Sequence, residues 1–227
     1  MIEIKNLYFS YSGVSPYILR DINLNIKDGE YISILGENGA GKSTLVKLIL
    51  KLLKPTSGEI NINSQKIGYV PQRKDLSNSN FPITAYEMLN CYRKILKIKN
   101  SNAIDSVLDK VKMKNFKNSL IGNLSGGQCQ KIFIARALIG NPDLLILDEP
   151  STGIDINSQN EIYELISGLN KHNNVTVISI EHNLKAAIAN STLIYHVADH
   201  TGHLCSPDEY VNEYLTANGR SNIYASL

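Results

Sequence analysis

One glycine-rich stretch limits what this chain can fold into more than any other: Gly36-Glu37-Asn38-Gly39-Ala40-Gly41-Lys42-Ser43-Thr44. It fits the pattern G-x-x-x-x-G-K-[ST] of a phosphate-binding loop, or P-loop. An apolar run over 31–35 predicts a buried strand before it, and a helical pattern follows over 45–53. A glycine loop between a strand and a helix can turn its backbone N–H groups toward a phosphate, and the helix N-terminus adds partial positive charge. We therefore expect Lys42 to reach the β- and γ-phosphates of a nucleotide and the Ser43 hydroxyl to ligate Mg²⁺.

Strand and helix patterns around the P-loop predict an α/β protein. Alternating or apolar runs predict strands at 2–9, 22–26, 59–63, 67–70, 144–147 and 175–180, and a terminal hairpin over 192–204. The strands before the P-loop alternate and predict a half-buried antiparallel sheet. Strand patterns disappear after residue 73, where helical patterns over 84–98 and 103–113 begin. We expect one domain over 1–227, with an α/β core at 1–72 and 141–227 and a helical lobe inserted at 73–140. Further helices are expected after residue 124, over 157–169, over 183–189 and from 206 to 215.

Polar side chains end three of these strands. Asp148 and Glu149 follow the apolar run at 144–147, His182 follows the run at 175–180, and Gln72 follows 67–70. Ligand-contacting residues collect at the carboxyl edge of an open α/β sheet. An Asp at such a position holds the Mg²⁺ shell in P-loop nucleotide hydrolases, and the neighbouring Glu can polarise a water. Two adjacent buried carboxylates would repel each other without a cation, which a Mg²⁺–nucleotide complex supplies.

A second glycine-containing helix start lies at Leu124-Ser125-Gly126-Gly127-Gln128. Two anion-binding helix starts in one chain indicate either two ligands or two subunits that share one ligand. A GTPase is disfavoured, because the nearest match to its base-reading Asn-Lys-x-Asp, at 170–173, lacks the Asp. The formal net charge of +2 offers no general reason to expect nucleic acid as a partner. No apolar stretch approaches the roughly 20 residues that a membrane-spanning helix needs.

Taken in order, these motifs resemble the ATP-binding cassette family of ATPases over nearly the whole chain, which implies a P-loop hydrolase core of the RecA-like kind. The residues at 36–44 match its Walker A motif, 124–128 its LSGGQ signature, 144–149 its Walker B motif with the catalytic Glu149, and 151–155 its D-loop with Asp155. Gln72 matches the Q-loop glutamine, His182 the switch histidine, and Tyr11 the aromatic residue that stacks on adenine.

The resemblance implies a mechanism and partners. Two copies pair head to tail, and each ATP lies between the Walker A motif of one subunit and the signature of the other. Glu149 activates the water, while Ser43, Gln72 and Asp148 hold the Mg²⁺. The helical lobe and the Gln72 loop receive a membrane permease, which places the chain at the cytoplasmic face of the cell membrane. Three positions depart from the common pattern: Glu181 and Asn183 beside the histidine, and Lys131 where Arg commonly follows the signature.

Within the family, the chain is most similar to ATPases of zinc and manganese uptake systems, through residues 67–72, 151–159 and 205–210. Such systems also use an extracytoplasmic metal-binding protein. Two alternatives remain: an importer subunit for an iron complex, or an assembly factor of the iron–sulfur type. Four residues with zinc-type side chains lie close in sequence: His196, His200, His203 and Cys205. They meet no regular zinc spacing, so a regulatory metal site and an ordinary hairpin are both open interpretations.

Overall fold

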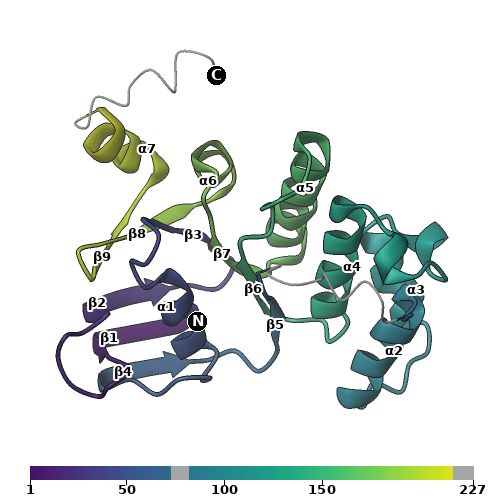
Figure 1. The fold of residues 1–227 in the computed structure, drawn as a ribbon, viewed down its shortest axis with the longest axis horizontal. Coiled ribbons are helices and arrows are strands. Elements are labelled where there is room, and N and C mark those ends of the chain that lie inside the picture. Colours follow the sequence, from purple (N-terminus) through teal and green to yellow (C-terminus); the bar gives the residue numbers. More distant parts are fainter. Residues whose placement is uncertain (73–81, 217–227) are drawn as a thin grey trace. The chain divides into compact units, whose positions relative to one another are not determined.

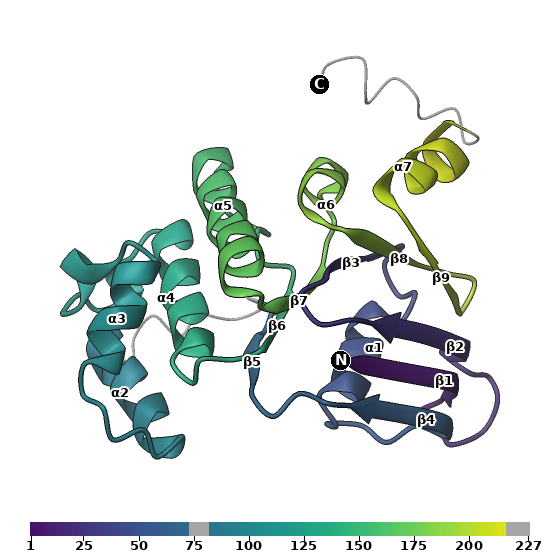
Figure 2. The ribbon, with the colours of Figure 1, turned by 180° about the vertical axis from the view of Figure 1, so that it is seen from behind.

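The computed structural model of this chain describes residues 1–72 and 82–216, which divide into two units. One unit joins Met1–Asn63 to the chain from Ile178 onward, and the other is Ser64–Val177. Figures 1 and 2 show their elements from opposite sides. The P-loop belongs to the first unit, and the strand that ends at Asp148 belongs to the second.

The first unit contains a three-stranded antiparallel sheet in the order β2-β1-β4, with bounds Leu19–Ile26, Ile2–Phe9 and Ser57–Ile62. Ile2, Ile4 and Leu7 of the central strand are buried, as the alternation predicts. The prediction that this sheet precedes the P-loop is incomplete, because its third strand β4 comes after the P-loop helix. Strand β4 pairs with the free edge of β1 and so extends a two-stranded ribbon, which alone is marginally stable, to three strands.

The P-loop strand of this unit, β3 (Tyr31–Gly36), runs parallel to β8 (Leu193–Ala198), and β8 forms an antiparallel hairpin with β9 (Thr201–Cys205). The end of β7 (Thr176–Ile180) lies beside β3, since Glu181 N donates to Ile34 O at 3.1 Å. Helices α1 (Lys42–Ile49), α6 (Leu184–Asn190) and α7 (Pro207–Tyr210) complete the unit, and a π-helical segment, Val211–Thr216, follows α7.

The second unit pairs β5 (Ile67–Val70) with β6 (Leu144–Asp148) in parallel, and the start of β7 lies beside β6. Four α-helices accompany these strands: α2 (Ala85–Ile95), α3 (Ala103–Lys110), α4 (Gly126–Leu138) and α5 (Ile156–Asn173). Short 3₁₀ helices lie at Lys114–Phe116 and Ile121–Asn123. Helix α4 packs against α2, α3, α5 and β5, so the helix that begins in the second glycine motif is the centre of this unit.

Several helix boundaries differ from prediction for backbone reasons. Helix α1 begins at Lys42, three residues before the first predicted residue, because Gly41 serves as its N-cap. It ends at Ile49, and Lys51 adopts a left-handed φ of 57° soon after. Helix α5 runs to Asn173, beyond the predicted end at 169, and Asn174 then caps it at φ 53°. The positions at which these helices begin and end thus depend on left-handed backbone turns. Asn tolerates such turns, and hydrophobic periodicity does not reveal them.

The predicted helical lobe is helical wherever the structure describes it before β6. Between residues 82 and 140, the described backbone contains helices and one isolated bridge, Thr84 to Leu120, but no named strand. Its first residues, 73–81, lie outside the described residues, and its boundaries stay a prediction.

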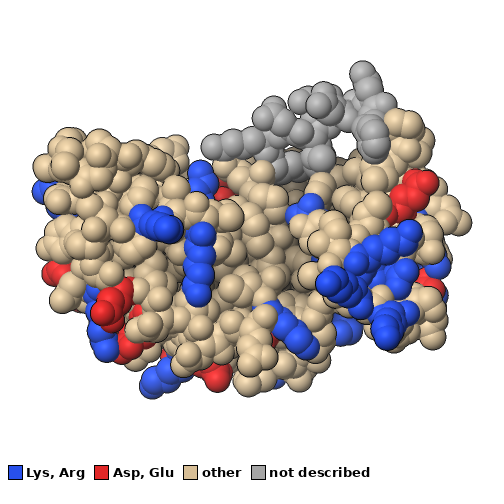
Figure 3. Space-filling model, turned by 90° about the horizontal axis from the view of Figure 1, so that it is seen from below, with Lys and Arg blue, Asp and Glu red and all other residues tan. Residues whose placement is uncertain are grey.

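Lys94 in the last turn of α2, and Lys97 and Lys99 just after it, are solvent-exposed, and Figure 3 shows Lys and Arg side chains on the surface of the molecule. None of the helices in the described part of the chain has both the length and the apolar character to cross a membrane.

Candidate functional site

The P-loop backbone can be built only with glycine at two of its turns. Gly36 has a φ of 149°, and a Cβ added there would lie 2.2 Å from Val197 O. Gly41 has a φ of 100°, and its added Cβ would lie 2.8 Å from a methyl group of Leu19. The loop therefore follows β3 at close backbone approach to β8 and turns directly into α1. This is the strand–loop–helix context that the sequence predicted.

Lys42 is the first residue of α1, and only 6% of it is exposed. Its Nζ donates hydrogen bonds to Gly36 O at 2.8 Å and to Glu37 O at 2.9 Å. A buried ammonium needs such partners, because burial removes its water. The bonds hold the charge over the loop, beside Ser43 and Thr44 in the first turn of the helix.

Tyr11, the residue that the family resemblance assigns to base stacking, lies beside the P-loop helix. Its hydroxyl lies 3.4 Å from Thr44 Oγ1, and its ring meets Phe9 edge-on with centroids 5.0 Å apart. The side chain is nevertheless 63% exposed. An exposed aromatic face next to a phosphate loop is a suitable platform for an aromatic base.

A cavity of about 1120 Å³ opens above the P-loop within the first unit. Its wall includes the loop residues Gly36 to Ala40, the last residues of β8, and Glu181 and His182, which follow β7. The structure thus brings His182 to the P-loop, although 138 residues separate it from Thr44. The carboxyl ends of parallel strands meet at one edge, which is why the two motifs share this cavity.

The residues that flank His182 have structural roles of their own. Glu181 is 2% exposed and accepts a hydrogen bond from Ser179 Oγ at 2.5 Å. Asn183 is the N-cap of α6, where its side-chain oxygen accepts from Ala186 N at 3.2 Å. His182 therefore lies between a buried hydrogen-bonded carboxyl and a helix cap, so its backbone is held on both sides.

In the second unit, Glu149 and Gln72 meet. Gln72 Nε2 donates a hydrogen bond to Glu149 Oε2, and Thr152 Oγ1 donates to the same oxygen at 3.2 Å. Glu149 has a left-handed φ of 52°, a strained conformation for a residue other than glycine. The Glu149 carboxylate is therefore oriented by two side chains, Gln72 after β5 and Thr152 in the turn that follows Glu149.

Asp148, the last residue of β6, is 5% exposed and contacts Tyr69 of the neighbouring strand β5. Burial raises the pKa of the Tyr69 hydroxyl, and the charge of Asp148 and a hydrogen bond to it raise it further. Tyr69 therefore remains a neutral donor to Asp148. The run 67–72, which carries part of the family likeness, thus includes two residues with a physical role: Tyr69 beside Asp148 and Gln72 beside Glu149.

The signature residues begin α4 through a reciprocal cap. Gln128 N donates to Ser125 Oγ at 3.2 Å, and Ser125 N donates to Gln128 Oε1 at 3.0 Å. Gly127 packs against Ser158 of α5, so closely that a Cβ added to Gly127 would lie 2.4 Å from that side chain. The D-loop Asp155 caps α5, accepting from Ser158 N at 3.0 Å, and this backbone hydrogen bond lowers the pKa of its carboxyl.

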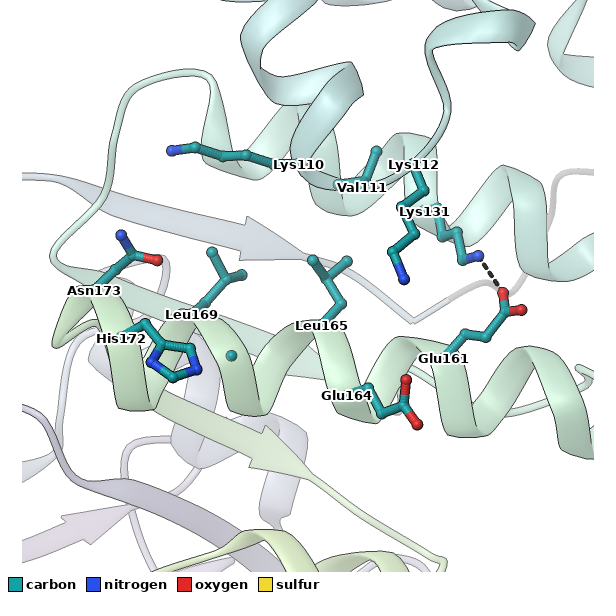
Figure 4. Close-up of a pocket in the computed structure, with 11 residues that line it drawn as sticks. Lys110, Val111, Lys112, Lys131, Glu161, Glu164, Leu165, Leu169, His172 and Asn173 are labelled. Carbon is teal, nitrogen blue, oxygen red and sulfur yellow. Dashed lines mark hydrogen bonds and ion pairs between the residues drawn. The ribbon is translucent and has the colours of Figure 1, made fainter.

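Lys131, which replaces the more common Arg, forms an ion pair with Glu161 of α5 (Figure 4). The pair lies at one end of a cavity of about 390 Å³ between α5 and the end of α3. On the α5 side, Leu165 and Leu169 line this cavity. The substitution thus retains a cation that ties the signature helix to α5.

The metal-site interpretation of the C-terminal hairpin is wrong for this structure. Among residues 1–72 and 82–216, no group of three or more His, Cys, Asp or Glu side chains could hold a metal ion. His200 Nδ1 lies 3.2 Å from Ile18 O, His196 packs edge-on against Tyr210, and the Cys205 thiol is buried against Ile194 O. His196 and His203 are paired across the hairpin, but His200 and Cys205 contact other groups, so the four side chains do not form a shared metal site.

The candidate residues therefore fall into two groups. The P-loop, Tyr11 and His182 lie in the first unit, and Gln72, Asp148, Glu149, the signature and Asp155 lie in the second. Sequence reasoning missed Thr152 and Gln159, which contact the carboxylate and the D-loop respectively. Both residues lie in the run 151–159, and their hydroxyl and amide groups carried no further signal.

Comparison with known proteins agrees with these motifs. Residues 19–152 match the family model described as ABC transporter. The chain is 53% identical over 214 residues to a probable metal transport system ATP-binding protein of Treponema pallidum, with 94% of this chain and 90% of that protein covered. It is 38% identical over 229 residues to the zinc import ATP-binding protein ZnuC of Rickettsia prowazekii, covering 100% and 94%.

The chain is also similar to a solved structure, the dimeric post-hydrolysis state of the ATP-binding cassette MJ0796 bound to ADP and Pi. The TM-score is 0.75 at 28% sequence identity, with 91% of this chain and 99% of that chain covered.

Proposed function

Since this chain belongs to the ABC transporter family of ATPases, we propose that it is the ATP-hydrolysing subunit of an importer for a divalent metal ion, with zinc as the leading candidate. The observation that carries the enzymatic part is the cavity that His182 shares with P-loop residues 36–40. A histidine at a phosphate loop can contact the terminal phosphate of ATP and distinguish it from ADP. The likeness to metal-transport and zinc-import ATP-binding proteins supports the cargo.

Nucleotide binding follows from the first unit. We expect Lys42 to exchange its two carbonyl partners for the β- and γ-phosphates, which offer charge-assisted hydrogen bonds. Backbone N–H groups of residues 36–44 surround the phosphates, and the N-terminus of α1 adds its dipole. The exposed ring of Tyr11 stacks on the adenine.

Hydrolysis needs a base, and Glu149 is the residue proposed for it. Its carboxylate accepts a proton from the attacking water, whose oxygen bonds to the γ-phosphorus while the bond to ADP breaks, which releases ADP and phosphate. Ser43, Asp148 and Gln72 offer a hydroxyl, a carboxylate and an amide oxygen, a donor set that suits Mg²⁺. Bound Mg²⁺ would neutralise the phosphate charge that develops during this reaction.

The proposal includes a second copy of the chain and a membrane permease. Residues 124–128 of one subunit contact the ATP bound to the other, with Asp155 beside them at the subunit interface. The dimeric MJ0796 cassette, to which this chain is similar, supports the pairing of two copies. The permease holds the pair at the cytoplasmic face of the membrane and receives metal from an extracytoplasmic binding protein, in which the choice of metal resides.

Three experiments test this function. Glu149→Gln should abolish turnover while it preserves ATP binding and traps an ATP-bound dimer, as measured by phosphate release and by size-exclusion chromatography. Normal hydrolysis by this variant would refute the assignment of the base. The matched control is Glu164→Gln on α5, a solvent-exposed glutamate that lies outside the proposed site.

The cargo is tested by the elemental content of cells that lack this chain, grown in metal-limited medium. A selective fall in zinc supports the zinc importer, and a selective fall in manganese or iron retains the importer but changes its cargo. An unchanged metal content contradicts metal import. Affinity purification of the tagged chain adds a second test, because an importer subunit recovers a polytopic permease and a soluble assembly factor does not.

A further inference from the structure

We propose that Gln159 is a positioning residue for ATP hydrolysis, which acts by holding loop 151–155 so that Thr152 orients Glu149. This inference rests on the proposed function, in which Glu149 activates the water. Gln159 lies in the first turn of α5, and all of the residues involved belong to the second unit. Its contacts form a chain of hydrogen bonds from a helix to the carboxylate.

The first step is a bridge across the loop. Gln159 Nε2 donates to Ser151 O at 3.2 Å and to Ile154 O at 2.8 Å. A primary amide has two N–H donors, so one side chain can hold both carbonyls. The carbonyls belong to the first and fourth residues of the loop, and the amide therefore fixes the distance between these two carbonyls.

A buried contact one helical turn later holds the start of the same loop. The hydroxyl groups of Ser151 and Tyr163 lie 2.7 Å apart, with 7% and 6% of these residues exposed. Gln159 and Tyr163 are four residues apart on α5, so their side chains project from the same face of the helix. The loop is thus held by two successive turns of a regular element.

The second step runs from the loop to the carboxylate. Thr152 lies between the two carbonyls that Gln159 holds, and its Oγ1 donates to Glu149 Oε2 at 3.2 Å. Gln72 donates to the same oxygen. Because a general base must be within hydrogen-bond reach of the proton that it removes, the orientation of this carboxylate decides its efficiency. A shift of the loop would move Thr152 and release one of the two donors.

Helix α5 is held by contacts other than those of Gln159, so loop 151–155 is the segment that a change at Gln159 should move. Its N-terminus is capped by Asp155, its Ser158 packs against Gly127 of the signature helix, and its Glu161 pairs with Lys131 (Figure 4). These contacts do not involve the Gln159 amide. Removing that amide should therefore loosen loop 151–155 and leave α5 in place.

The test compares ATP hydrolysis by the full-length chain in four forms: wild type, Gln159→Leu, Thr152→Ala and the double variant. Leu retains the bulk of Gln but cannot bond the two carbonyls. We expect Gln159→Leu to lower kcat about tenfold, because small misplacements of a catalytic group are costly, while KM for ATP changes less than about twofold. Thr152→Ala should give a similar loss, and the double variant should lose no more than either single variant, because both changes break one chain of contacts.

Two further variants distinguish positioning from general stability. Thr152→Ser retains the hydroxyl and should restore kcat, and Asn160→Ala, at an exposed neighbour of Gln159, should leave kcat unchanged. Wild-type kcat in Gln159→Leu would overturn the inference, as would independent, multiplicative losses in the double variant. Thr152 is exposed, so Thr152→Ala remains informative even if Gln159→Leu folds poorly.

Glu149→Gln, measured alongside, separates the two proposals. If it is inactive and Gln159→Leu has wild-type kcat, only the positioning role is wrong. If Glu149→Gln hydrolyses ATP normally, the proposed base is wrong, and the positioning role is refuted with it.

Discussion

The contact between Gly127 and Ser158 predicts an unusual sign for a common substitution. Gly→Ala within a helix normally stabilises a protein, by up to about 1 kcal/mol. At Gly127, however, the new Cβ would lie 2.4 Å from both Cβ and Oγ of Ser158 and 3.3 Å from a methyl group of Ile154. The Cβ of Ser158 cannot rotate away, because it is attached to the backbone of α5. The two helices must therefore separate.

Overpacking of this kind costs about 1–3 kcal/mol. After the gain in helix propensity is subtracted, we expect Gly127→Ala to lower the free energy of unfolding by up to about 2 kcal/mol. The matched control is Gly168→Ala on α5, where nothing lies within 4 Å of the added Cβ. That substitution should raise the free energy of unfolding by about 0.5–1 kcal/mol. Two substitutions of one chemical type are thus expected to have opposite effects.

Urea unfolding followed by circular dichroism measures both effects through the midpoint and the slope. Ser158→Gly removes the opposing Cβ and should recover part of the loss in a double-mutant cycle, by about 1 kcal/mol, whereas Ser158→Ala retains the Cβ and should recover little. The packing argument is refuted if Gly127→Ala is as stabilising as Gly168→Ala, or if Ser158→Gly recovers nothing.

Two other predictions concern the first unit. Lys42→Ala should weaken ATP binding about 10- to 100-fold, because the variant loses one or two charge-assisted hydrogen bonds to the phosphates. Titration with a fluorescent nucleotide measures this affinity, and an unchanged affinity would contradict the phosphate role of Lys42. Burial lowers the pKa of His196, with His203 adding to the effect and Glu37 opposing it, so its NMR titration midpoint should fall below that of an exposed histidine. Because the unfolded chain then takes up this proton first, stability should fall as the pH drops from about 7 toward 5. His196→Asn should show a smaller fall, and an equal fall in both proteins would exclude His196 as its source.

Much of the fold was predictable from periodicity and motif order. The β1 bounds match the predicted strand at both ends, and the apolar runs before Asp148 and after Val175 are buried strands. The helix ends were less predictable. Gly41, Lys51 and Asn174 end or begin helices through left-handed backbone angles, and these depend on local packing more than on hydrophobic pattern.

In the candidate site, too, some features were predictable from the sequence and others depended on packing. Each chemical group was recognisable as a motif because its residue types and spacing serve one chemistry, as with Lys42 in the P-loop and Glu149 after an apolar strand. The histidines and Cys205 of the terminal hairpin had suitable types without suitable geometry: His196 and His203 are paired across the hairpin, but His200 and Cys205 contact other groups. Residue type therefore predicted chemistry only where a backbone motif also fixed the direction of the side chains.

The sequence by itself determined the class of reaction, since the P-loop, the signature and the two carboxylates are contiguous motifs whose local backbone is set by their own residues. Only the tertiary structure decided which side chains from other elements support them: Gln72 on Glu149, Gln159 on the D-loop, and Ser158 against Gly127. Such contacts join residues that lie on different elements or loops. Their positions depend on strand pairing and helix packing, which arise from the whole buried core and not from any local pattern.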